Sequence, residues 1–65
     1  MFKIFITLIN HENGDRREFI YNWLYKSSAE AWEDSNKMAY IRFDKKEKSR
    51  VTHECIATVR GSYYV

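Results

Sequence analysis

The residues best suited to chemistry are His53 and Cys55, two positions apart near the end of the chain. In an extended strand, residues at that spacing project to the same face, so the imidazole would lie beside the thiol. Such a pair can generate a reactive thiolate or contribute to a metal site. Two ligands do not complete a metal site, however, and an inward cysteine usually serves as a small apolar filler. The pair therefore predicts no catalytic, metal-binding or cofactor-binding residue.

Acidic side chains cluster at Glu30, Glu33 and Asp34. Their spacing suits the N-terminal end of a helix, where the helix dipole favours negative charge, better than it suits a general acid and base pair. The chain also lacks a glycine-rich phosphate loop and a Cys-x-x-Cys pair. We therefore expect no enzyme, no cofactor and no small-molecule substrate.

Size and composition predict one small domain spanning residues 1–65. A chain of this length buries only about 60% of the surface that it exposes when unfolded, so it usually needs a disulfide, a metal or a partner. The single cysteine excludes an internal disulfide, which leaves a protein partner. Eleven basic and nine acidic residues give a net charge of +2, a weak signal for nucleic acid. With neither a membrane span nor a signal peptide in the sequence, we expect a cytoplasmic protein.

The strand predicted at residues 2–10 organises the fold. Its apolar side chains occupy both alternating faces, which is typical of a central strand with neighbours on each side. One face carries Phe2, Ile4, Ile6 and Leu8, and the other carries Phe5 and Ile9.

Asn13-Gly14 predicts a two-residue type I′ hairpin turn that leads into a second strand at residues 17–26. If these two residues form the turn, Leu8 pairs with Phe19, and Phe2 pairs with Tyr25. The same register pairs Ile6 with Tyr21 and Ile4 with Trp23.

Ser27 fits the N-cap of a helix predicted at residues 28–44, with Glu30 completing a capping box. Residues 40–43 also have high strand propensity, so a shorter helix followed by a fourth strand stays open. After a charged connection, alternation resumes in a strand at residues 51–60, and residues 61–65 form a short tail. The small Cys55 on this strand predicts a bulky cover, for which Trp32 and Phe43 are the candidates.

The fold class that follows is α+β: a ββαβ chain with a three-stranded antiparallel sheet, order 2-1-3, and one helix packed on one face. Which face the helix covers is left open. The opposite face would then expose apolar side chains to a partner protein, either a host protein or a second copy in a homodimer. The predicted partner-binding residues are Phe5, Ile9, Ile20, Leu24 and Ile56, with Tyr63 and Tyr64 as anchors in the tail.

The alternative function is binding of RNA or single-stranded DNA. Its phosphate contacts would come from the charged connection, and its bases would stack on exposed tyrosines. The hairpin aromatics Phe19, Tyr21 and Trp23 are interpreted instead as core beneath the helix. The predicted nucleic-acid residues are Lys45, Lys46, Lys48 and Arg50.

A hairpin, a single helix and a final strand, in a short proline-free chain rich in Lys, Glu, Asn and aromatics, resembles the small early proteins of tailed phages. The resemblance lies in layout over the whole chain and rests on no signature motif. It implies a stoichiometric binder that inhibits or redirects a host factor in the host cytoplasm, as antitoxin-like inhibitors of RNA-cleaving toxins do. It assigns a role to no residue.

Overall fold

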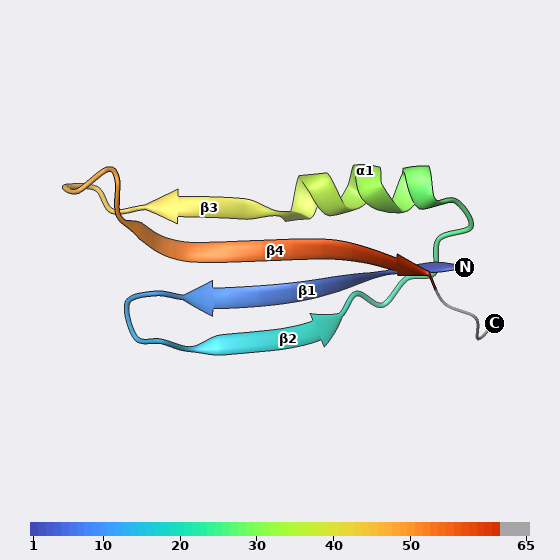
Figure 1. The fold of residues 1–65 in the computed structure, drawn as a ribbon, viewed down its shortest axis with the longest axis horizontal. Coiled ribbons are helices and arrows are strands. Elements are labelled where there is room, and N and C mark those ends of the chain that lie inside the picture. The colour runs from blue at the N-terminus through green and yellow to red at the C-terminus, as the bar shows by residue number, and fades with distance from the viewer. Residues whose placement is uncertain (62–65) are drawn as a thin grey trace.

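A computed structural model describes residues 1–61 of the chain. Within them lie five elements: β1 (Phe2–Asn10), β2 (Arg16–Ile20), α1 (Ser28–Met38), β3 (Tyr40–Phe43) and β4 (Val51–Gly61). The strands form one antiparallel sheet in the order β2-β1-β4-β3, with α1 continuing the line of β3 beside β4 (Figure 1). The α+β class and the central position of β1 are confirmed, but the sheet has four strands, not three.

The predicted helix at residues 28–44 is too long, because α1 ends at Met38. Its start is as expected, with the Ser27 hydroxyl accepting a hydrogen bond from the Ala29 N–H at 3.2 Å. Ala39 is already extended, and the next four residues pair with β4. The strand propensity of Tyr40–Phe43 therefore prevails, and the alternative of a fourth strand is the correct one.

The hairpin register differs from the prediction by two residues, since Ile6 pairs with Phe19 and Leu8 with Arg17. The reason is the turn. Within residues 1–61, positive φ occurs only at Gly14, at 79°, whereas a type I′ turn would require it at Asn13 as well. The loop is therefore longer, and the Asn13 side chain accepts a hydrogen bond from the Asp15 N–H at 2.9 Å.

The second strand is also shorter than predicted, because β2 ends at Ile20 rather than at residue 26. Between Ile20 and Tyr25 the chain has two more residues than the facing part of β1, and residues 21–24 accommodate them in a turn. The chain then forms the isolated pair of Phe2 with Tyr25, which is the one predicted hairpin pair that the structure contains. The Tyr21 N–H donates to the Ile4 carbonyl at 2.9 Å, and the Trp23 N–H donates to the Tyr21 carbonyl at 2.8 Å. This tight turn leaves Trp23 63% exposed.

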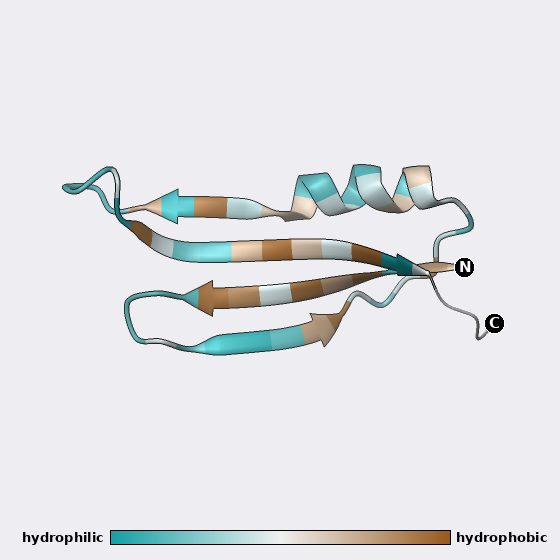
Figure 2. Ribbon diagram, viewed as in Figure 1, coloured by the Kyte–Doolittle hydropathy of each residue, from teal (hydrophilic) through white to brown (hydrophobic). Residues whose placement is uncertain are grey.

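The core lies between α1 and one face of β1 and β4, the two central strands along which apolar residues concentrate (Figure 2). On the helix, the buried side chains are the small ones, Ala31 and Ser35. Trp32 and Phe43, predicted to cover Cys55, are both exposed. The core contains Ile4, Ile6, Tyr25, Ala31 and Cys55, with Phe2, Leu8, Met38, Ala57 and Val59 packed around them.

A hydrogen bond ties the helix to the hairpin: the buried Tyr25 donates its hydroxyl proton to Asp34 Oδ2 at 2.7 Å. This bond, with burial and the negative charge of Asp34, raises the pKa of Tyr25 to about 12. Because the folded state favours the neutral phenol, the stabilisation is complete below the unfolded pKa of about 10 and is lost as the pH rises toward 12.

We predict that the free energy of unfolding of the wild type falls between pH 10 and pH 12 relative to that of Tyr25→Phe, measured by urea unfolding. The variant keeps the ring but has no phenol to ionise. Equal pH dependence of the two proteins over this interval would contradict the assigned bond.

Candidate interaction face

The side of the sheet turned away from the core is the open face, which we define by the outward side chains of all four strands. Cross-strand pairing places Phe5 beside Ile20 and Thr7 beside Ile56. On the edge strand, Ile41 pairs with Glu54, which is itself next to Ile9. The open face consists of Lys3, Phe5, Thr7, Ile9, Arg16, Glu18, Ile20, Ile41, Glu54, Ile56, Thr58 and Arg60.

The apolar side chains of the open face reach solvent. Ile20 is 50% exposed, Ile41 55% and Ile56 41%, whereas Ile4 on the core side is fully buried. Phe5 and Ile9, on the central strand, are half-buried. An aliphatic band thus crosses the sheet diagonally from β2 to β3, with Thr7, Thr58 and Glu54 interspersed, and no other described element packs over it.

The predicted partner-binding residues fall largely on this face. Phe5, Ile9, Ile20 and Ile56 lie on it by register. Leu24, in the turn after β2, is exposed in a shallow pocket that Lys3 and Ile20 also line. Tyr63 and Tyr64 lie outside the described residues.

Sequence reasoning missed Ile41 because it placed this residue in the helix. The alternation within Tyr40–Phe43 was the available signal, since a strand there sends Tyr40 and Arg42 to one face and Ile41 to the other. The interpretation of the hairpin aromatics as core is wrong as well. Phe19 is 48% exposed and Tyr21 40%, because α1 packs over β4 and β1 and lies away from β2, at the opposite edge of the sheet (Figure 1).

Charge divides the open face along its length. Lys3 and Arg60 are direct cross-strand neighbours at one end, and neither forms an ion pair within residues 1–61. The Arg60 guanidinium lies over the Phe5 ring, 4.7 Å from its centroid. At the other end, Glu54 Oε1 lies 3.1 Å from His11 Nε2. One end is therefore basic, and the other carries an acidic residue.

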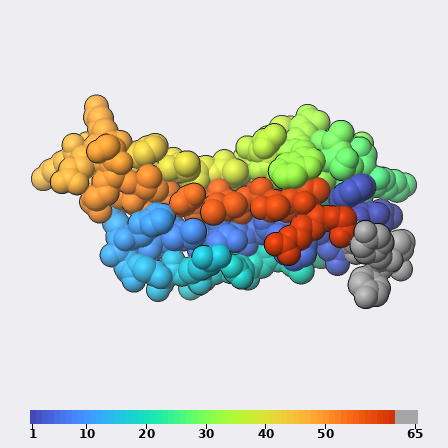
Figure 3. All heavy atoms as spheres, in the orientation of Figure 1, coloured from blue at the N-terminus to red at the C-terminus, as the bar shows by residue number. Residues whose placement is uncertain are grey.

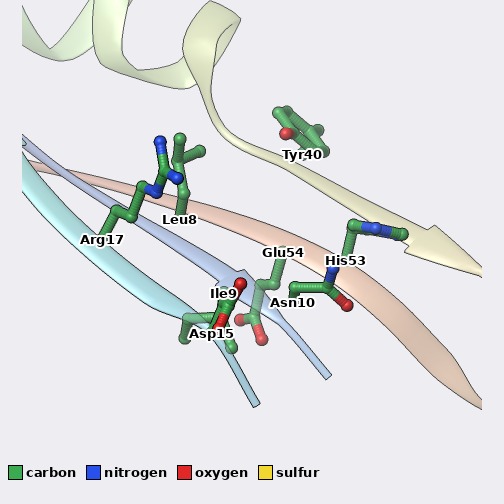
Figure 4. Close-up of a pocket in the computed structure, with 8 residues that line it drawn as sticks. All are labelled: Leu8, Ile9, Asn10, Asp15, Arg17, Tyr40, His53 and Glu54. Carbon is green, nitrogen blue, oxygen red and sulfur yellow. The ribbon is translucent and has the colours of Figure 1, made fainter. Parts of the chain in front are cut away.

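A pocket of about 300 Å³ lies beyond the end of the helix (Figure 4). Leu8, Arg17 and Tyr40 point to one side of the sheet there, and Ile9 and Glu54 point to the other (Figure 4). The other lining residues are Asn10, Asp15 and His53. Among the described residues, no hydrogen bond joins His53 to a carboxylate of this pocket, because its Nδ1 lies against Thr52 and Glu54 contacts His11.

The His53 and Cys55 pair does not form a reactive dyad. His53 Nδ1 lies 3.1 Å from Thr52 Oγ1, and no hydrogen bond joins the ring to the thiol in the described part of the chain. Cys55 is buried in the core, and this burial raises the pKa of its thiol. In residues 1–61, no group of three or more His, Cys, Asp or Glu side chains could hold a metal ion.

The predicted phosphate-binding residues lie on the loop between β3 and β4. Arg50 is held by its own loop, with Nη2 3.1 Å from Asp44 Oδ1 and Nε 3.4 Å from Glu47 Oε2. The Glu47 N–H, which donates to Asp44, and then the Lys46 N–H and Arg50 lower the pKa of that carboxyl. Lys45, Lys46 and Lys48 are exposed and form no ion pair with another described residue.

No known family model, curated protein or solved structure matches this chain. Of the helices in the described range, none has the length and apolar character needed to cross a bilayer.

We predict that Cys55 resists alkylation at neutral pH in the folded protein and reacts readily in urea. The buried thiol is shielded and its pKa is raised, so little thiolate is available. The measurement is the rate of iodoacetamide labelling, followed by intact mass, with and without denaturant. A labelling rate in the folded state equal to that in urea would indicate an accessible thiol. It would then support a reactive pair of His53 and Cys55.

Proposed function

We propose that this chain is a non-enzymatic protein-interaction module that binds its partner stoichiometrically through the open face. The observation that supports this most is the aliphatic band of Ile20, Ile41 and Ile56, exposed on the side of the sheet that the helix does not cover. Burying such a band releases apolar surface from water, at about 25 cal/mol per Å². A central apolar band with a charged rim is the usual composition of a protein interface.

The overall shape supports the same proposal. The chain has a radius of gyration of 14.0 Å, whereas a compact domain of this length would have one of about 11 Å. Figure 3 shows an elongated outline with the helix at one end and the β3–β4 loop at the other. Such a shape presents a long face relative to its volume, as a docking module needs.

The resemblance to phage early proteins suggests the biological form of this activity. An inhibitor or antitoxin-like protein that acts on a host protein needs affinity and shape complementarity, and it needs no catalytic group. The chain offers a sheet face with exposed apolar side chains, and burial raises the pKa of its one thiol, which are both consistent with that role.

We predict that Ile56→Glu abolishes partner binding while Trp32→Glu leaves it intact. Both residues are exposed and apolar, but only Ile56 lies on the open face. A buried, unpaired carboxylate there would cost several kcal/mol. The measurement is affinity capture from host extract with immobilised wild type and the two variants, followed by mass spectrometry, with circular dichroism confirming that each variant is folded.

The outcome that overturns the proposal is an identical captured set for Ile56→Glu and the wild type. Loss of the set with both variants would also count against it, because binding would then not be specific to the open face.

Binding of single-stranded nucleic acid is the second candidate, favoured by the exposed aromatic side chains on the core side of the sheet beyond the helix. Phe19 and Tyr40 are both exposed there, and the Arg42 guanidinium lies 5.2 Å from the Tyr40 ring centroid. Stacked aromatic and guanidinium groups can hold unpaired bases, and the nearby lysines could contact phosphates.

This second candidate predicts that a labelled single-stranded oligonucleotide binds and that its affinity falls steeply with salt, as released counterions require. Substituting Tyr40→Ala should weaken the binding, and Trp32→Ala should not. The measurement is fluorescence anisotropy at two salt concentrations. Absence of binding at low salt would eliminate this candidate and leave the protein-interaction proposal untouched.

A further inference from the structure

The open face is large, exposes apolar side chains and carries opposite charges toward its two ends, and these three properties favour one kind of partner. The inference rests on the proposed function, since it names what the open face binds. The long and middle extents of the molecule are 46 and 20 Å. A standard protein interface covers about 800 Å² on each partner, which a side of this size can supply.

The exposed area of the chain indicates how much surface a partner would cover. The chain exposes 5340 Å², whereas a compact monomer of 7.9 kDa would expose about 4400 Å². The excess is close to one side of a standard interface. A protein of this size thus reaches ordinary burial once one such face is covered.

A flat, twisted sheet fits best against another sheet. Two sheets pack face to face about 10 Å apart, with their outward side chains interdigitating. The molecule is 13 Å along its shortest axis, so two copies stacked through their open faces would form a sandwich of ordinary thickness with the helices outside. Identical copies most often associate about a two-fold axis, which requires a face complementary to itself.

The two-fold axis lies in the plane between the sheets and can run either parallel to the strands or across them. The charges on the open face distinguish these two arrangements. With the axis parallel to the strands, the Lys3 and Arg60 end of one copy lies over the same end of the other, and four positive charges meet. With the axis across the strands, the copies are reversed end for end. When this axis crosses β4 at Ala57, Arg60 of one copy lies over Glu54 of the other, because the two residues are three positions either side of Ala57 on the same strand. Only the second arrangement is complementary.

We propose that the open face binds a second copy of this chain, related by a two-fold axis that crosses the strands, so that Arg60 of each copy pairs with Glu54 of the other. Phe5 and Ile56, which lie close to the axis on the two central strands, supply the apolar centre of the interface, and the two ion pairs on either side of it set the orientation. The Arg16 and Glu18 pair on the β2 edge, joined at 2.8 Å, is neutral and compatible with the rim.

The test is a charge-reversal cycle followed by sedimentation equilibrium, starting from a wild type that dimerises. Arg60→Glu and Glu54→Arg should each raise the dimer dissociation constant about tenfold or more, because each places like charges opposite one another. The double variant should return most of the lost affinity, since the pair is restored with reversed polarity. Lys37→Glu, on the helix surface beside Glu33, is the matched control and should leave the constant unchanged.

A wild type that stays monomeric into the millimolar range overturns the inference, as does a double variant no tighter than the weaker single variant. A dimer insensitive to Arg60→Glu overturns it too. If the wild type is monomeric while Ile56→Glu alone loses a captured host protein, the second copy is excluded and the proposed function stands. Circular dichroism of each variant separates weakened association from unfolding.

Discussion

The helix is too short to cover the sheet, and its length determines how much apolar surface stays exposed on both faces. Eleven residues of α-helix span about 17 Å, whereas the eleven residues of β4 extend about 36 Å. The helix therefore covers one end of one face. Beyond it the same face is open around Leu8 and Tyr40, and the other face is open along its whole length.

The core that remains is small and is built for close approach. Ala31 and Ser35 bring the helix backbone near β4, and the Tyr25 hydroxyl fastens it to the hairpin through Asp34. The Ser35 hydroxyl is itself satisfied, donating to the Trp32 carbonyl at 2.9 Å. A core of this size provides little stability by itself. Covering the open face would add to the small apolar area that the folded chain buries. Binding of a partner would therefore raise the free energy of unfolding.

Sequence patterns were sufficient to predict the parts of the fold that depend on alternation. The two-sided apolar character of residues 2–10 predicts a central strand, and Ser27 predicts the helix start. The open face was also predictable in outline. The hairpin register was off by two, and a shift of two keeps each side chain on its face, so Ile20 stays on the outward side although it pairs with Phe5 rather than with Thr7.

The helix end and the hairpin turn could not be predicted, because at each place two local structures compete and a single sequence does not decide between them. Residues 40–43 could continue the helix or pair with β4, and pairing with a distant strand decided between them. The backbone of Asn13 avoids positive φ because the side-chain amide caps a longer loop. The two extra residues between Ile20 and Tyr25 follow from that loop, and they turn Trp23 outward. The pairing of Arg60 with Glu54 could be inferred only once the strand register was known.

The chain leaves its own aliphatic band uncovered. The most direct test is the accessibility of the isoleucine methyl groups to a dissolved nitroxide, measured by NMR line broadening in protein dilute enough to be monomeric. The account predicts strong broadening for Ile20, Ile41 and Ile56 and little for Ile4 and Ile6. Equal protection of all five would show that the chain covers this face itself and would contradict the account.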